Sequence, residues 1–115
     1  MKLGPERIIQ CQAVHWLKEK HPAIIVIANF SEQDCHIIYR KLANKMGYYK
    51  GQSDLFFPES RIGYKGMWIE VKAPKGRPSK EQIDFQFEMR MLGYDTAFTY
   101  GYDELESRIK FYFSL

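Results

Sequence analysis

Two short stretches decide the fold of this chain: residues 67–73 read MWIEVKA, and residues 51–58 read GQSDLFFP. Both are apolar runs rich in strand-favouring residues and bounded by Gly and Pro, so we predict two strands joined by a Gly-containing turn. Side chains alternate between the faces of a strand, which places Glu70 and Lys72 together on one face, about 6 to 7 Å apart. If the two strands pair, Asp54 lies beside them.

Burying two acids and a lysine in strands that are otherwise apolar is costly in free energy. A hard divalent cation accounts for this arrangement, because Mg²⁺ is commonly held by one or two carboxylates together with waters and phosphate oxygens. Lys72 would then stabilise charge on a phosphate or help to position an attacking water. The alternative is an exposed ion pair between Glu70 and Lys72 on a half-solvated sheet, because an E-x-K triplet occurs by chance in many sequences.

The order of these features resembles the D…E-x-K pattern of the PD-(D/E)xK nucleases, and more closely that of the virus-type replication-repair nuclease (VRR-NUC) family. The matching segments are G-x-x-D at 51–54, I-E-x-K at 69–72, the basic loop KGR at 75–77, and Gln82. This ordered set favours a functional site over a chance ion pair. The superfamily pattern has a Pro directly before the Asp, whereas this chain has Ser53 at that position. The Pro shapes the backbone and is not a metal ligand.

The resemblance implies a metal-dependent endonuclease that hydrolyses phosphodiester bonds in DNA. It assigns catalytic roles to Asp54, Glu70, Lys72, Gln82 and Glu6. Mg²⁺ or Mn²⁺ would be held by Asp54, Glu70, the backbone carbonyl of Val71 and, through water, Glu6. Lys72 would orient the nucleophile or neutralise developing charge, and Gln82 would support that geometry.

Compact proteins of this family look like phage or bacterial DNA-repair enzymes that resemble Holliday-junction resolvases, so branched DNA is the expected substrate. Two symmetric cuts suit a C2 homodimer. Two alternatives stay open: a nuclease for flap or linear DNA, and a non-catalytic nucleic-acid-binding module of the same fold. The joint presence of both acids, the lysine and Gln82 favours catalysis. RNA is not excluded as a substrate.

Glu6 and Gln82 each allow two interpretations. Glu6 opens a helical pattern, where an acid also complements the positive end of the helix dipole. Gln82 lies in the S-x-x-Q pattern of a capping box that begins at Ser79, so it can cap the helix, reach the site, or do both. The resemblance favours the functional role for both residues.

The remaining elements follow from periodicity. We predict helices at 5–20, from about 31 to 47, at 79–92 and from 102 or 103 to the end, and strands at 23–28 and 95–100, in addition to the two strands already described. The strand at 23–28 is a continuous apolar run and is expected to be central and buried on both faces. The order α-β-α-β-β-α-β-α predicts a single α/β domain over residues 1–115 with a mixed sheet, as in the restriction-endonuclease-like fold.

The net charge of +3 is too small by itself to imply a nucleic-acid partner, but its distribution is informative. Residues 59–80 contain six basic residues and only two acids. The basic residues are Arg61, Lys65, Lys72, Lys75, Arg77 and Lys80, and the acids are Glu59 and Glu70. From this group we expect Lys65, Lys75, Arg77 and Lys80 to contact nucleic acid.

The two cysteines and three histidines lack the spacing of metal ligands or of a disulfide framework. The sequence contains no apolar run long enough to span a membrane and no signal-peptide pattern, so we expect a soluble protein of the cytoplasm of a bacterial or phage-infected cell.

Overall fold

The computed structural model describes residues 3–29, 41–42 and 45–115. A four-stranded sheet lies at its centre, in the order β1-β2-β3-β4. The first three strands are antiparallel neighbours and β4 runs parallel to β3, so the predicted mixed sheet is confirmed. The elements are α1 (Pro5–Lys20), β1 (Ile27–Ala28), β2 (Leu55–Phe57), β3 (Met67–Lys72), α3 (Lys80–Met91), β4 (Asp95–Tyr100) and α4 (Tyr102–Phe113).

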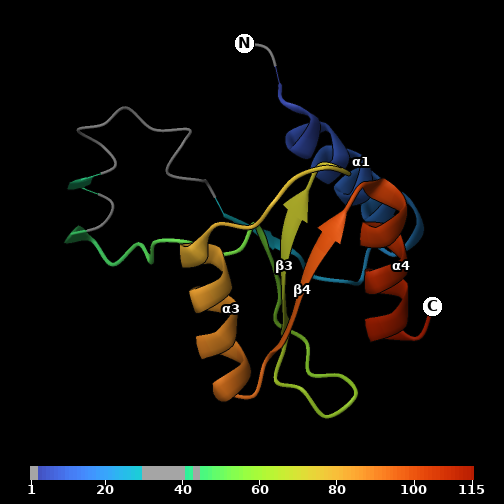
Figure 1. The fold of residues 1–115 in the computed structure, drawn as a ribbon. Coiled ribbons are helices and arrows are strands. Elements are labelled where there is room, and N and C mark those ends of the chain that lie inside the picture. The colour runs from blue at the N-terminus through green and yellow to red at the C-terminus, as the bar shows by residue number, and fades with distance from the viewer. Residues whose placement is uncertain (1–2, 30–40, 43–44) are drawn as a thin grey trace.

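Helices cover both faces of the sheet: α1 and α4 lie on one side and α3 on the other (Figure 1). The predicted alternation along β3 accounts for this layering, because every second side chain of the strand points to the same face. Met67, Ile69 and Val71 join the buried core with residues of α1, β2 and α4. On the opposite face, Trp68 stacks on Phe56 of β2 and packs edge-on against Phe85 of α3.

Local sequence signals set the ends of the helices. Pro5 stands in the first turn of α1, where its missing N–H costs little. Ser79 and Gln82 form the predicted capping box at the start of α3. Gly93 follows this helix with φ +100°, a left-handed conformation that glycine adopts without strain.

The predicted strand at 23–28 is shorter and less buried than expected. Only Ile27 and Ala28 form a strand, and it lies at the edge of the sheet beside β2 rather than at the centre. Ile24 and Val26 pack against the core, whereas Ile25 is 62% exposed. The prediction of a central strand was wrong because β2 and β3 occupy the middle of the sheet, which leaves this apolar run only one face to bury.

The structure describes only part of one predicted helix and shows an unexpected buried residue in another. The helix predicted at 31–47 falls mostly on residues 31–40 and 43–44, which lie outside the described part of the chain. Within that range, Leu42 and Met46 are exposed. In α3, Phe85 and Gln86 are both buried, whereas Leu92, directly after the helix, is 55% exposed. The inward face of α3 is therefore partly polar.

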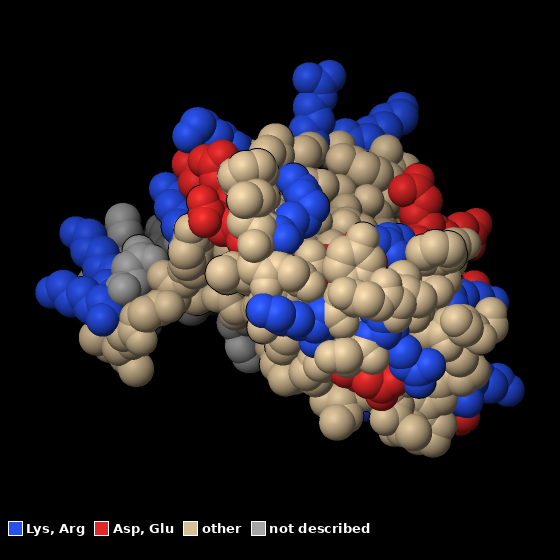
Figure 2. Space-filling view, turned by 90° about the horizontal axis from the view of Figure 1, so that it is seen from below, with Lys and Arg blue, Asp and Glu red and all other residues tan. Residues whose placement is uncertain are grey.

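One face of the molecule carries charged side chains that are spread out rather than gathered. In the view of Figure 2, Lys and Arg side chains are scattered among uncharged residues and do not form one continuous basic area. No helix in the described residues is both long and apolar enough to cross a membrane. On this face, the distribution of charge alone therefore does not mark a binding surface.

Candidate active site

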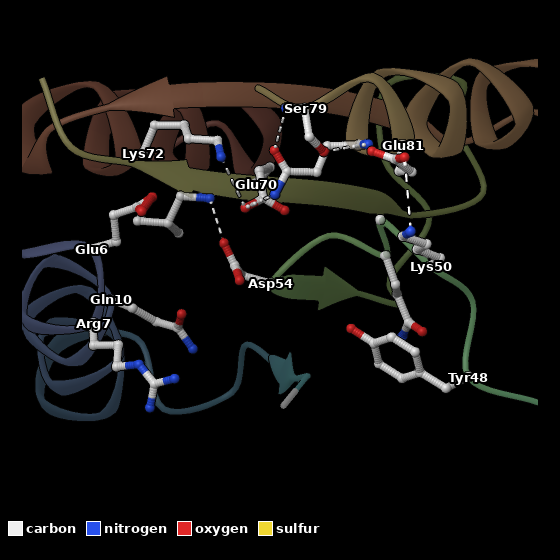
Figure 3. Close-up of a pocket in the computed structure, with 14 residues that line it drawn as sticks. Glu6, Arg7, Gln10, Tyr48, Lys50, Asp54, Glu70, Lys72, Ser79 and Glu81 are labelled. Atoms are coloured by element: carbon white, nitrogen blue, oxygen red, sulfur yellow. Dashed lines mark hydrogen bonds and ion pairs between the residues drawn. The ribbon is translucent and has the colours of Figure 1, made fainter. Parts of the chain in front are cut away.

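The residues predicted to be catalytic, Glu6, Asp54, Glu70, Lys72 and Gln82, meet in one pocket of about 300 Å³ at the end of β3. Figure 3 shows that Asp54, Glu70 and Lys72 point toward one another there. The first turns of α1 and α3 and the segment before β2 complete its walls. The lining residues are Glu6, Arg7, Gln10, Tyr48, Lys50, Gly51, Gln52, Asp54, Glu70, Val71, Lys72, Ser79, Glu81 and Gln82.

The register of the sheet brings Asp54 to Glu70. Leu55 of β2 pairs with Ile69 of β3, so the residue before Leu55 lies opposite the residue after Ile69. The backbone N–H of Val71 donates a hydrogen bond of 2.8 Å to Oδ2 of Asp54 and holds the carboxylate in this place. Two acids that are 16 positions apart in the sequence thus become neighbours.

The close approach of the preceding segment to α3 depends on a glycine. Gly51 has φ +83°, and a Cβ atom at this position would lie 2.2 Å from the backbone oxygen of Glu81. Any larger residue would push the segment away from the start of α3. The glycine of the G-x-x-D pattern therefore lets the chain reach Asp54 along the wall of the pocket.

The neighbouring carboxyl groups of Asp54 and Glu70 both have raised pKa values. Burial raises the pKa of Glu70 to about 9, and the neighbouring charges of Asp54 and Glu6 act in the same direction, while Lys72 opposes them. Burial also raises the pKa of Asp54, against the lowering effects of its hydrogen bonds and of Lys72 and Arg7. Without further positive charge the pair favours holding a proton, as two adjacent buried carboxyls do.

The pair has the chemistry of a partial cation site. Oε1 of Glu70 is buried and has no hydrogen-bond donor, and carboxylate oxygens are the ligands that hard divalent cations prefer. Within the described residues, however, no group of three His, Cys, Asp or Glu side chains is arranged to hold a metal. This donor set fits an ion such as Mg²⁺, which takes one or two carboxylates and fills its other positions with water and phosphate oxygens.

Lys72 and Gln82 both reach Glu70. Nζ of Lys72 lies 3.8 Å from Oε2 of Glu70, and both side chains are less than a tenth exposed. Nε2 of Gln82 donates to the same Oε2 at 3.2 Å, while its Oε1 accepts from the backbone N–H of Ser79 at 2.9 Å. The capping and site contacts predicted as alternatives for Gln82 thus coexist.

Of the other predicted site residues, two line the pocket and four lie outside it. Glu6 lines the pocket from the first turn of α1, and Val71 lines it from β3. Lys75, Arg77 and Lys80 are exposed beyond the end of β3, and Lys80 pairs with Asp84 at 3.1 Å. Lys65 precedes β3, at the far end of the strand from Lys72, and does not line the pocket.

Several lining residues add to the set predicted as catalytic. Arg7 was not predicted; its only sequence signal is its position next to Glu6 in the first turn of the helix. Tyr48 and Lys50 line the pocket, and Lys50 lies 3.9 Å from Glu81. Tyr49, between them, packs its ring edge-on against Phe85 and so anchors this segment to α3.

Comparison with known proteins supports the predicted fold. No protein-family model and no curated protein sequence matches the chain. A solved structure described as "VRR_NUC domain protein" aligns with a TM-score of 0.78 and 20% sequence identity, over 98% of this chain and 91% of that chain. The chain therefore has the α/β fold of a VRR_NUC domain protein, the restriction-endonuclease-like architecture that its sequence predicts.

Proposed function

We propose that this protein is a metal-dependent nuclease that hydrolyses phosphodiester bonds in DNA. The observation that carries the proposal is the pair of Asp54 and Glu70, whose carboxyl groups share a pocket with Lys72, 3.8 Å from Glu70, and leave one buried oxygen without a donor. The fold of a VRR_NUC domain protein supports the same class of activity. A purely structural ion pair would not require a second buried acid beside it.

In this proposal Asp54, Glu70 and the backbone carbonyl of Val71 hold Mg²⁺ or Mn²⁺, and Glu6 contributes through water. When bound, the ion lowers the pKa of a coordinated water and offsets negative charge on the phosphate. The ammonium group of Lys72 stabilises negative charge that develops on the scissile phosphate and orients the attacking water.

Gln82 and the burial of the charged side chains support this arrangement. Gln82 fixes the orientation of the Glu70 carboxylate through its hydrogen bond to Oε2. Burial of Glu70 and Lys72 limits the water that can screen their charges, which strengthens each electrostatic contact inside the pocket.

The direct test is a strand-cleavage assay with Mg²⁺ or Mn²⁺ on branched DNA, comparing the wild type with Asp54→Ala and Lys72→Ala. Asp103→Ala, at an exposed acid in the first turn of α4, is the matched control. We expect cleavage by the wild type and the control, and loss of cleavage in both site variants. DNA binding that survives in every variant with no cleavage in either metal would instead support a non-catalytic binding module.

For the substrate, we propose branched DNA of the Holliday-junction type, processed during DNA repair in the cytoplasm of a bacterial or phage-infected cell. Lys75, Arg77 and Lys80 would contact phosphates next to the pocket, and Lys65 would contact a more distant part of a duplex. Flap and linear DNA are the alternatives, and RNA is a further candidate. Cleavage rates on matched junction, flap, duplex and RNA substrates separate these possibilities.

We also propose a homodimer, because two symmetric cuts in a junction require two sites related by a two-fold axis. The outer face of α3 supports this proposal: Ile83, Phe87 and Met91 recur every four residues and are 47%, 52% and 70% exposed. Two copies of α3 crossing antiparallel at Phe87 would bring Ile83 onto Met91 of the partner subunit. The same arrangement would bring Asp84 to Arg90 of the partner subunit, which gives complementary charges beside an apolar centre.

A further inference from the structure

A second polar contact lies behind Asp54 and outside the pocket. Nε2 of Gln86 donates to Oγ of Ser53 at 3.2 Å and to the backbone oxygen of Ala97 at 2.8 Å. Gln86 is 1% exposed and Ser53 is 0% exposed. Neither residue lines the pocket, so the contact belongs to the support of the site rather than to its lining.

The burial of Gln86 and Ser53 restricts the Gln86 side chain to these hydrogen-bond partners. A buried amide that loses its partners costs more than the hydrogen bond is worth in water, so the surroundings hold Gln86 in one arrangement. The carbonyl of Ala97 can only accept, which fixes the NH₂ end of the Gln86 side chain toward β4 and Ser53. The side chain therefore ties three segments together: α3, β4 and the residue directly before Asp54.

Helix α3 consequently contacts the Glu70 carboxylate directly and is linked to Asp54 through Ser53. Gln82 and Gln86 are four residues apart and so lie on the same face of the helix. Gln82 donates directly to Glu70, whereas Gln86 holds Ser53, whose backbone continues into Asp54. Val71 is the other anchor of Asp54, through its N–H. A shift of Ser53 would therefore move one carboxylate of the pair relative to the other.

We propose that Ser53 and Gln86 are positioning residues that set the separation of Asp54 from Glu70 for divalent-cation binding. This inference rests on the proposed function, because it requires a cation at the carboxyl pair. It assigns a role to two residues that contact neither the cation nor the substrate. Loss of the contact should weaken cation binding because Asp54 would no longer be held in the binding geometry before the ion arrives.

The test measures the affinity for Mn²⁺ alone by isothermal titration calorimetry, without DNA. Ser53→Ala removes the acceptor, and Gln86→Met removes the donor while keeping the length of the side chain. We expect each variant to bind Mn²⁺ about five- to tenfold more weakly, the size expected for one buried hydrogen bond. The double variant should be weaker by much less than the product of the two losses, because both changes remove the same contact.

Cleavage kinetics add a second measurement. The Mn²⁺ concentration for half-maximal cleavage should rise in both variants, and most of the rate should return at saturating Mn²⁺. Ile109→Val, in the core formed by α1 and α4, is the control: it lowers the unfolding temperature and should leave Mn²⁺ affinity unchanged. Ser53→Ala removes a single hydroxyl group and keeps the test valid if Gln86→Met fails to fold.

The outcomes separate the two proposals. If Asp54→Ala abolishes Mn²⁺ binding while Ser53→Ala and Gln86→Met bind as tightly as the wild type, the contact is only structural and the positioning proposal falls. If Asp54→Ala binds Mn²⁺ as the wild type does, the carboxyl pair is not a cation site, and both proposals fall.

Discussion

The backbone N–H of Val71 donates a 2.8 Å hydrogen bond to Oδ2 of Asp54, so the strand that carries Glu70 also holds the second carboxylate. The contact joins residues 17 positions apart and leaves two acids side by side in the pocket. The electrostatic cost of this arrangement governs how the metal-free protein should respond to pH and to substitution.

The first prediction concerns pH. Burial raises the pKa of Glu70 from 4.5 to about 9, so the folded state favours the protonated acid. This contribution to stability is complete below about pH 4.5 and is lost as the pH rises toward 9, with a slope of at most about 1.4 kcal/mol per pH unit for one group. The free energy of unfolding in EDTA should therefore fall between pH 6 and 9 and fall much less in Glu70→Gln.

Urea unfolding curves at several pH values measure this slope. Glu88→Gln, at an exposed position of α3, is the control and should retain the decline of the wild type. Equal slopes in the wild type and Glu70→Gln would contradict the assignment. Adding Mn²⁺ at pH 8 should raise the stability of the wild type by mass action, because the ion binds the folded site.

The second prediction concerns Lys72, the cation nearest to Glu70 in the pocket. Lys72→Met keeps the length of the aliphatic chain but removes the positive charge, and should lower kcat by about 10²- to 10³-fold because charge developing on the phosphate is no longer stabilised. Junction binding should change by no more than about twofold, because the other basic residues proposed to contact the DNA backbone are unchanged. Single-turnover cleavage and gel-shift titrations measure the two quantities; Lys18→Met, on the exposed face of α1, should match the wild type.

The third prediction separates the two contacts of Gln82. Ser79→Ala removes only the cap of α3 and should lower the free energy of unfolding by about 1 kcal/mol without a change in cleavage rate. Gln82→Ala should destabilise by a similar amount and, because Glu70 loses a hydrogen bond, also lower the cleavage rate about tenfold. If both variants lose activity to the same extent, helix capping alone explains the effect.

The fourth prediction concerns the outer face of α3. If the proposed dimer forms, Phe87→Glu should convert it to a monomer, because a two-fold contact would bring two like charges together. Size-exclusion chromatography with light scattering measures the mass. Phe111→Glu, at a phenylalanine that is 68% exposed on α4, is the matched control and should leave the dimer intact. A wild-type protein that is monomeric at high concentration would refute the dimer.

The sequence predicted the local structure of β3 and the start of α3, and it named the residues proposed for the site. Alternation along residues 67–72 placed Glu70 and Lys72 on one face, and the capping box located the start of α3, because both signals act between residues a few positions apart. Gly51 and Gly93 both have a positive φ in the structure, a conformation that glycine adopts without strain.

The tertiary structure alone decided which residues support that site and which apolar run is central. The run at 23–28 looked like a buried strand, but burial depends on neighbours, and the neighbours of β1 leave it at the edge. Gln86 looked like an ordinary polar helix residue, yet packing placed it against Ser53 and Ala97. Periodicity shows which side chains share a face of an element; only the assembled sheet and helices decide what that face meets.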